Sequence, residues 1–131
     1  MFASVFVLLY AAHLLSDYPL QTDHQAAHKA SHGDHGWRAN LSHAGTHVLV
    51  TWLALGAGAL LLDDVTLTPG RTLLALAWVG VTHSVIDRRW PIAWWMRRAG
   101  QTEWAKHGGA AHVDQTAHVT ALVIAALILS A

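Results

Sequence analysis

Four apolar stretches separated by polar segments organise the chain. They cover residues 2–16, 44–62, 72–86 and 113–130. A bilayer core about 30 Å thick needs about 20 helical residues to cross it. The second and fourth stretches approach that length, whereas the first and third reach it only if their helices continue through flanking His and Asp residues.

We therefore predict one transmembrane domain, 1–131, of the all-α class. It is an integral membrane four-helix bundle with up-down-up-down connections. The spans are predicted at about 2–17, 41–62, 71–88 and 112–130.

The segments between the stretches predict the orientation. Segment 63–71 is a short turn marked by Pro69 and Gly70, whereas 18–40 and 88–111 are longer and polar. Seven of the eight basic residues fall in the two long segments: Lys29, Arg38, Arg88, Arg89, Arg97, Arg98 and Lys106. Because basic loops stay cytoplasmic, we predict an inner-membrane protein with cytoplasmic long loops and both termini external.

Composition excludes several other classes of function. Charged residues make up 12% of the chain, hydrophobic residues 53%, and the formal net charge is zero, so no nucleic-acid partner is expected. Cysteine is absent, which excludes thiolate sites and disulfides. Any metal must bind nitrogen and oxygen ligands, and the eleven histidines point to that chemistry.

Each predicted helix carries a polar pair spaced by four residues at its cytoplasmic end. The pairs are His13 and Asp17, His43 and His47, His83 and Asp87, and Asp114 and His118. This spacing places both members on one helix face, and alternating helix directions bring all four pairs to one membrane level.

The pairs predict two layers. The deeper layer holds His13, His47, His83 and His118, and the layer about 6 Å nearer the cytoplasm holds Asp17, His43, Asp87 and Asp114. The offset is 70 residues from His13 to His83 and from Asp17 to Asp87, and 71 from His43 to Asp114. This spacing predicts a duplicated helical hairpin around a central site.

A single membrane histidine is often only an interhelical hydrogen-bond partner, and Asp114 would suit a helix N-terminus. Four pairs at matched depth favour a metal site. Imidazole and carboxylate ligands suit divalent Zn, Mn, Fe or Ni. Eight candidates exceed the four ligands of a structural zinc site, so up to two ions with open positions are expected.

Other polar residues are weaker candidates for the site. Gln21 and Gln115 could orient ligands, although Pro19 leaves the position of Gln21 open. Arg88 and Arg89 could hold a phosphate or act only as positive-inside anchors. The histidines of the first long segment, His24, His28, His32 and His35, are expected to form a solvated loop rather than gather metal.

The remaining polar and aromatic residues lie in the second long segment. His112 is expected to point away from the site, and His107 is ambiguous. Tryptophans alternate with basic residues over 88–106, which predicts either an interfacial segment on anionic lipid or a simple anchor belt.

Three segments carry a resemblance to a known family. They are His13-Leu-Leu-Ser-Asp17-Tyr-Pro-Leu-Gln21, His83-Ser-Val-Ile-Asp87-Arg-Arg-Trp90 and Asp114-Gln-Thr-Ala-His118. The chain resembles small bacterial and phage membrane proteins catalogued as domain of unknown function 3307, which implies a multi-span membrane protein. It is also similar, at the level of fold, to membrane-bound metal-dependent hydrolases.

The leading hypothesis is a membrane-embedded metal-dependent hydrolase acting on a phosphoester or lipid-linked substrate at the cytoplasmic face. Asp17, Asp87 and Asp114 are the candidate catalytic carboxylates, one of them serving as general base. A divalent-metal carrier or sensor, and a structural or pore-forming phage membrane protein, are the alternatives.

Overall fold

The computed structural model describes residues 1–131, and helices make up most of the chain. The elements are α1 (Phe2–Asp17), α2 (Asp23–His28), α3 (Gly33–Leu61), α4 (Pro69–Asp87), α5 (Trp90–Arg98), α6 (Thr102–Trp104), the π-helical η1 (Ala105–Gly109) and α7 (Ala110–Ser130). No strand is present, so the predicted all-α class is confirmed.

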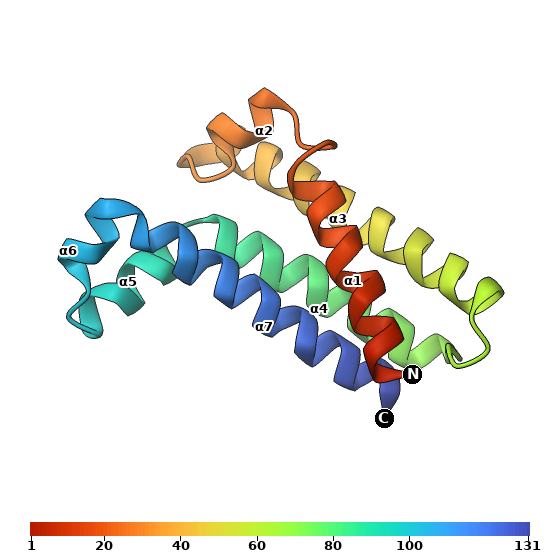
Figure 1. Cartoon of the computed structure of the whole chain (residues 1–131). Helices are drawn as coiled ribbons and strands as arrows, with labels where there is room; N and C mark the ends of the chain where they lie inside the picture. The colour runs from red at the N-terminus through yellow and green to blue at the C-terminus, as the bar shows by residue number, and fades with distance from the viewer.

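The four long helices α1, α3, α4 and α7 form the body of the molecule (Figure 1). α1 contacts α3 and α7, and α4 contacts the same two helices, which closes the four into a ring. Both termini lie at one end of this body, and α2, α5 and α6 lie toward the other (Figure 1). Placement of this bundle in a membrane stays a prediction.

The segments predicted as long loops contain further helices. α3 begins at Gly33, about two turns before the predicted span, and the tight turn before it depends on glycine. Gly33 has a φ of 76°, and a Cβ on Gly36 would collide with the Ser31 carbonyl. Glycine at these two positions permits the turn that starts α3, so residues 33–40 are helical rather than part of a loop.

The second long segment is also largely helical. α4 stops because Arg89 adopts the left-handed conformation with a φ of 62°, and Pro91 then occupies the first turn of α5. Gly108, with a φ of 94°, marks the kink at which the chain turns into α7.

The bundle interior is divided into an apolar and a polar half. The apolar core gathers Val5, Leu9, Leu55, Val65, Ala75, Val79, Leu122, Ala125, Ala126 and Leu129. Val65 comes from the short connection between α3 and α4, so this half lies at that end of the bundle. Buried histidines and Asp87 fill the other half, together with the largely enclosed Asp17.

The outer faces of the long helices carry large apolar side chains. Leu60 is 87% exposed and Leu73 69%, and Val7 and Leu127 are also exposed. Two helices are long and apolar enough to cross a membrane, Gly33–Leu61 and Thr102–Ser130, while Phe2–Asp17 is apolar but shorter. The molecule therefore combines a partly polar interior with apolar outer faces.

Candidate metal centre

Asp17, the last residue of α1, lies at the centre of one group of imidazoles. Its Oδ1 atom is 3.1 Å from His43 Nε2 and 3.2 Å from His47 Nε2, both on α3. Its Oδ2 atom is 3.1 Å from His13 Nε2, one helical turn earlier. His83 Nε2 of α4 lies 3.7 Å from Oδ1. Three helices thus converge on one carboxylate.

Asp87, the last residue of α4, holds the corresponding place in a second group. Its Oδ2 atom is 3.1 Å from His83 Nε2 and 3.5 Å from His43 Nε2. His118 Nε2 of α7 is 3.9 Å from Oδ1. Lys29 also reaches in, with its Nζ atom 3.0 Å from Asp87 Oδ2. The two groups share His43 and His83 and form one continuous network.

The two layers predicted from the pairs merge as a result. Asp17 and His43 were assigned to the shallower layer, yet they contact His13 and His47 of the deeper one. The aspartate side chains span the turn that separates the layers. His47 and His83 stack with ring centroids 3.4 Å apart, which shows how tightly the groups meet.

His118 has the bonding pattern of a metal-ligating histidine. Its Nδ1 atom is 3.0 Å from the Asp114 carbonyl and 3.3 Å from Asp114 Oδ2, so Nδ1 carries the proton. Nε2 then presents a lone pair to the interior, where it has no hydrogen-bond partner. Metal-bound histidines commonly use one ring nitrogen in this way to fix the other.

Unpartnered buried atoms recur across the network. Nε2 of His13, His83 and His118 and Oδ2 of Asp87 form no hydrogen bond of good geometry, although charged neighbours lie close. A cavity of about 10 Å³, also lined by His47, lies beside three of these rings. Buried polar atoms without partners are costly, and a shared cation would satisfy several at once.

His43 shows the same mismatch at a single atom. Its Nε2 is 3.1 Å from Asp17 Oδ1, which requires a proton on the ring nitrogen, and 3.3 Å from Lys29 Nζ, which requires a lone pair. One nitrogen cannot meet both demands. A cation held by both His43 Nε2 and Asp17 Oδ1 would remove the need for a proton between these two atoms.

The ligand atoms fall into two sets that could each hold an ion. One comprises Asp17, His43, His47 and His83, and the other His83, Asp87 and His118, with all ligand atoms of a set within 4.8 Å of one another. His13 borders the first set through Asp17. Asp114 belongs to neither set and touches the network only through His118.

The residues predicted to orient ligands or bind phosphate lie in different places. Gln21 donates to the Asp17 backbone carbonyl at 2.5 Å, so it holds the end of α1 rather than the carboxylate. Gln115 lies beside His13. Arg88 donates to the carbonyls of Lys29 and Ser31, so its guanidinium braces the connection between α2 and α3.

Arg89 instead faces a cavity of about 610 Å³ beside the network. Asp87 and Asp114 line this cavity, and they are the two acidic residues on its wall. Its cationic lining consists of Lys29, Arg89, Arg97 and Lys106. Its apolar lining comes from Ile92, Ala93, Met96, Ala105, Ala110 and Ala111.

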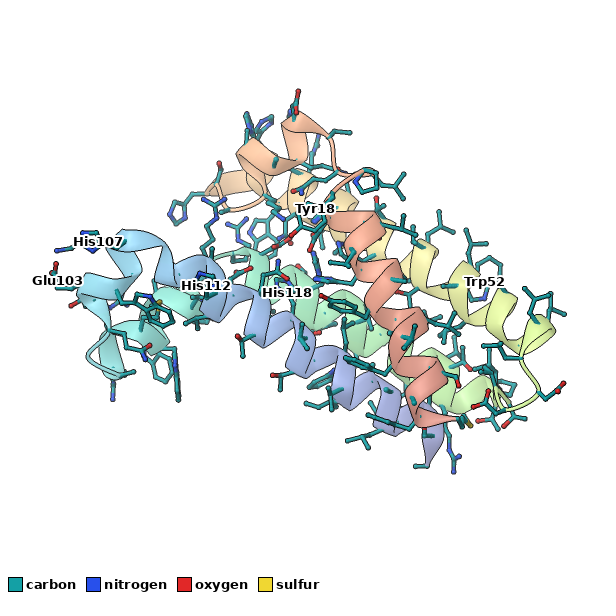
Figure 2. All side chains as sticks on the ribbon, in the orientation of Figure 1. Tyr18, Trp52, Glu103, His107, His112 and His118 are labelled. Carbon is teal, nitrogen blue, oxygen red and sulfur yellow. The ribbon has the colours of Figure 1, made fainter.

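Histidines outside the predicted set lie elsewhere. His112 is exposed and stacks on Trp104, and the His107 ring contacts the Glu103 carbonyl, at the outer end of the molecule (Figure 2). His118 lies among side chains between the helices in the same view. His24, His28 and His35 lie on α2 and α3 rather than in a loop, and although His24 and His35 are exposed, the three rings contact one another.

Two polar features of the site were missed in the sequence. Lys29 enters the network because α2 is a short capped helix. The capping box of Thr22 and Gln25 that starts α2 was visible as a T-x-x-Q pattern. Asn40 donates to the Ser84 carbonyl at 3.0 Å, and the Ser84 hydroxyl donates to Asn40 in return. No spacing in the sequence pairs those two residues.

A family model described as a protein of unknown function, DUF3307, matches residues 5–131, nearly the whole chain. No curated protein and no solved structure matches the chain. The match agrees with the resemblance drawn from the three motifs, and it assigns no activity.

Proposed function

This chain belongs to the DUF3307 family, and we propose that it is a membrane-embedded, metal-dependent hydrolase of phosphoester or lipid-linked substrates. One observation carries the proposal. Asp87 and Asp114 link a buried network, in which three imidazole Nε2 atoms have no hydrogen-bond partner, to a cavity with a cationic and apolar lining.

The distribution of polar residues supports placement of the bundle in a membrane. Soluble bundles bury an apolar stripe and expose polar faces. Here His43, His47 and Asp87 are buried, whereas Leu60 and Leu73 are among the most exposed side chains. Ionisable residues inside a membrane bundle normally face one another or a polar cavity, as these do.

The basic residues support an inner-membrane orientation with the site at the cytoplasmic face. Seven of the eight cations lie in the two long segments 18–40 and 88–111, outside the apolar half of the bundle. α5 buries Ile92 and Met96 and exposes Trp90, Trp94 and Trp95. Such a helix suits the lipid–water interface beside anionic headgroups.

The ligand chemistry supports a divalent transition metal. Histidine and aspartate together favour Zn, Mn or Fe, and the two overlapping sets allow up to two ions. Lys29 already neutralises Asp87, so the set around Asp17 is the more available for a first ion. A bound ion would supply Lewis acidity and an activated water.

The chain's own residues would bind and orient the substrate. Arg89 and Arg97 offer forked donors for a phosphate. The apolar wall with Ile92 and Met96 would accept the adjoining hydrocarbon of a lipid-linked substrate. Asp114 is the best placed general base, because it lines the cavity and its carboxylate is 27% exposed, whereas Asp17 is enclosed by histidines.

The test combines metal content and hydrolysis. We expect the buried network of the protein, purified in detergent without a polyhistidine tag, to hold up to two transition-metal ions per chain by elemental mass spectrometry. A His13→Ala/His83→Ala variant should lose them. Metal-loaded protein should hydrolyse members of a panel of soluble and lipid-linked phosphoesters, stop on chelation, and recover with one divalent ion.

His83→Ala should abolish turnover, whereas the exposed His112→Ala should retain it. Arg89→Ala should raise KM for a phosphoester more than it lowers kcat, because Arg89 would bind ground and transition states alike. Full turnover by His83→Ala would refute the proposal. Equal metal content in the wild type and His13→Ala/His83→Ala after loading with Zn, Mn, Fe and Ni would favour the structural alternative, in which the ion pairs only hold the helices together.

A metal carrier is the weaker candidate. Transport requires polar groups along the whole path, but the interior beyond the histidines is closed by residues such as Leu9, Leu55 and Leu129. Metal flux through liposomes containing the protein would revive that alternative.

A further inference from the structure

A second group of histidines lies outside the buried network. His24 and His28 are one turn apart on α2, and His35 is in the first turn of α3. Their ring centroids are 4.5–4.9 Å apart in all three pairings. One nitrogen from each ring lies within 4.8 Å of the others. The three imidazoles thus face a common point.

The fold holds these rings together without help from an ion. Thr22 and Gln25 cap α2 reciprocally, and the Gln25 amide also donates to the Ser42 hydroxyl of α3 at 3.1 Å. Arg88 donates to the carbonyls of Lys29 and Ser31 at the other end of the connection. α2 is therefore tied to both α3 and the end of α4, which fixes the angle between the histidine-bearing elements.

The surroundings of His28 suit metal binding. Nδ1 of His28 is buried and has no hydrogen-bond partner, an arrangement that loses a water contact without replacing it. Partial desolvation, with the neighbouring His35 and His24, lowers the pKa of His28. At neutral pH the ring is therefore neutral, which is the form that coordinates a metal.

We propose that His24, His28 and His35 form a second metal site, separate from the buried network, which takes a borderline divalent transition ion such as Zn²⁺. Three imidazole ligands with no carboxylate disfavour Mg²⁺, Ca²⁺ and Mn²⁺, which prefer oxygen. Water would complete the coordination shell.

This site adjoins the buried network through one residue. Lys29 follows His28 directly, and its ammonium contacts Asp87 and His43 of the buried network. An ion bound by α2 and α3 would hold α2 in place, and with it the lysine that covers Asp87. The proposed site stands independently of the hydrolase proposal, because it uses none of the same ligands.

The test is a Zn²⁺ titration of the full chain in detergent, without a polyhistidine tag, followed by calorimetry and elemental analysis. We expect His28→Gln/His35→Gln to bind one Zn²⁺ fewer per chain than the wild type. The matched control is His32→Gln/His107→Gln, which removes two histidines outside the cluster and should bind as many ions as the wild type.

A His13→Ala/His83→Ala variant distinguishes the proposed site from the buried network. It should retain the single Zn²⁺ that His28→Gln/His35→Gln loses. Affinity at this site should fall as pH drops, because protons compete with the ion for imidazole ligands. Equal Zn²⁺ content in the wild type and His28→Gln/His35→Gln would overturn the proposal, as would an equal loss in the His32→Gln/His107→Gln control. Either result would leave the hydrolase test unaffected.

Discussion

At the scale of single residues, two carboxylates organise five buried imidazoles. Asp17 approaches three histidine Nε2 atoms within 3.2 Å, and Asp87 approaches His83 and the Lys29 ammonium within 3.1 Å. The two aspartates therefore have different partners. Asp17 meets only imidazoles, whereas Asp87 also contacts the Lys29 ammonium.

Replacing Asp17 by Asn should remove most metal binding. The amide keeps the size of the side chain but supplies no anion and no second acceptor for the surrounding nitrogens. We expect metal affinity to fall by about 100-fold or more, beyond the loss typical of residues that only orient a ligand. Metal titration measures this change. Asp63→Asn, in the exposed turn after α3, is the control and should bind as the wild type does. An equal affinity of both variants would exclude Asp17 as a ligand.

Replacing Lys29 by Met should destabilise the metal-free protein. Asp87 would lose its cation while only 6% of its side chain is exposed, and breaking such a pair costs about 3 kcal/mol. We expect a lower Tm in detergent and a larger rise in Tm on adding Zn²⁺, because an ion would then compensate Asp87. Lys106→Met breaks the exposed pair with Glu103 and should cost less than about 1 kcal/mol. A Tm for Lys29→Met no lower than that of Lys106→Met would contradict this role.

At the scale of elements, the site depends on how closely α3 and α4 approach. A Cβ on Gly80 of α4 would lie 2.8 Å from Val48 Cγ2 of α3, whereas a Cβ on Gly56 of α3 would meet nothing within 4 Å. The same two helices are joined by Asn40 and Ser84 near the network. Small residues at helix contacts allow such close approach.

Gly80→Ala should therefore destabilise the bundle by about 1–3 kcal/mol, the usual range for overpacking. Val48 is stiff because it is β-branched in a helix, so it cannot turn away at low cost. Gly56→Ala should be neutral or stabilise by up to about 1 kcal/mol, as alanine favours helix. Thermal unfolding of both variants in the same detergent measures the difference. An equal Tm for the two would show that α3 and α4 can separate freely.

The two helix ends that carry aspartate also resemble each other. Within each pair, His13 to Asp17 and His83 to Asp87, the Nε2 to Oδ2 distance is 3.1 Å. The hairpin repeat itself stays a prediction. The halves differ in that Lys29 joins Asp87, and in that the second pair of α3 is two histidines while that of α7 is Asp114 and His118.

At the scale of the whole molecule, the proposal rests on a bilayer around the apolar faces. The chain has no cysteine, so single cysteines can report its orientation without further changes. In intact cells a membrane-impermeant maleimide should label Asp63→Cys, in the short turn. Ser31→Cys and Ala99→Cys should react only in inverted vesicles, because both lie in the basic segments. Labelling of all three from one side would rule out four alternating spans.

The sequence by itself determined the helical class and the residues brought together. Apolar stretches of helical length and polar pairs spaced by four fix which face of each helix is polar, because helical geometry is local. Alternating directions then place His13, His47, His83 and His118 together. The four-residue spacing therefore predicted most of the side chains that lie together in the candidate centre.

Only the tertiary structure decided how far each side chain reaches and what else enters the site. Lys29 reaches Asp87 because α2 folds back on α3, and the left-handed Arg89 directs the chain into α5 and so forms the cavity wall. His24, His28 and His35 meet for the same reason. Such contacts join segments outside the helices that carry the polar pairs or at their ends. The helical repeat of the sequence therefore does not predict them.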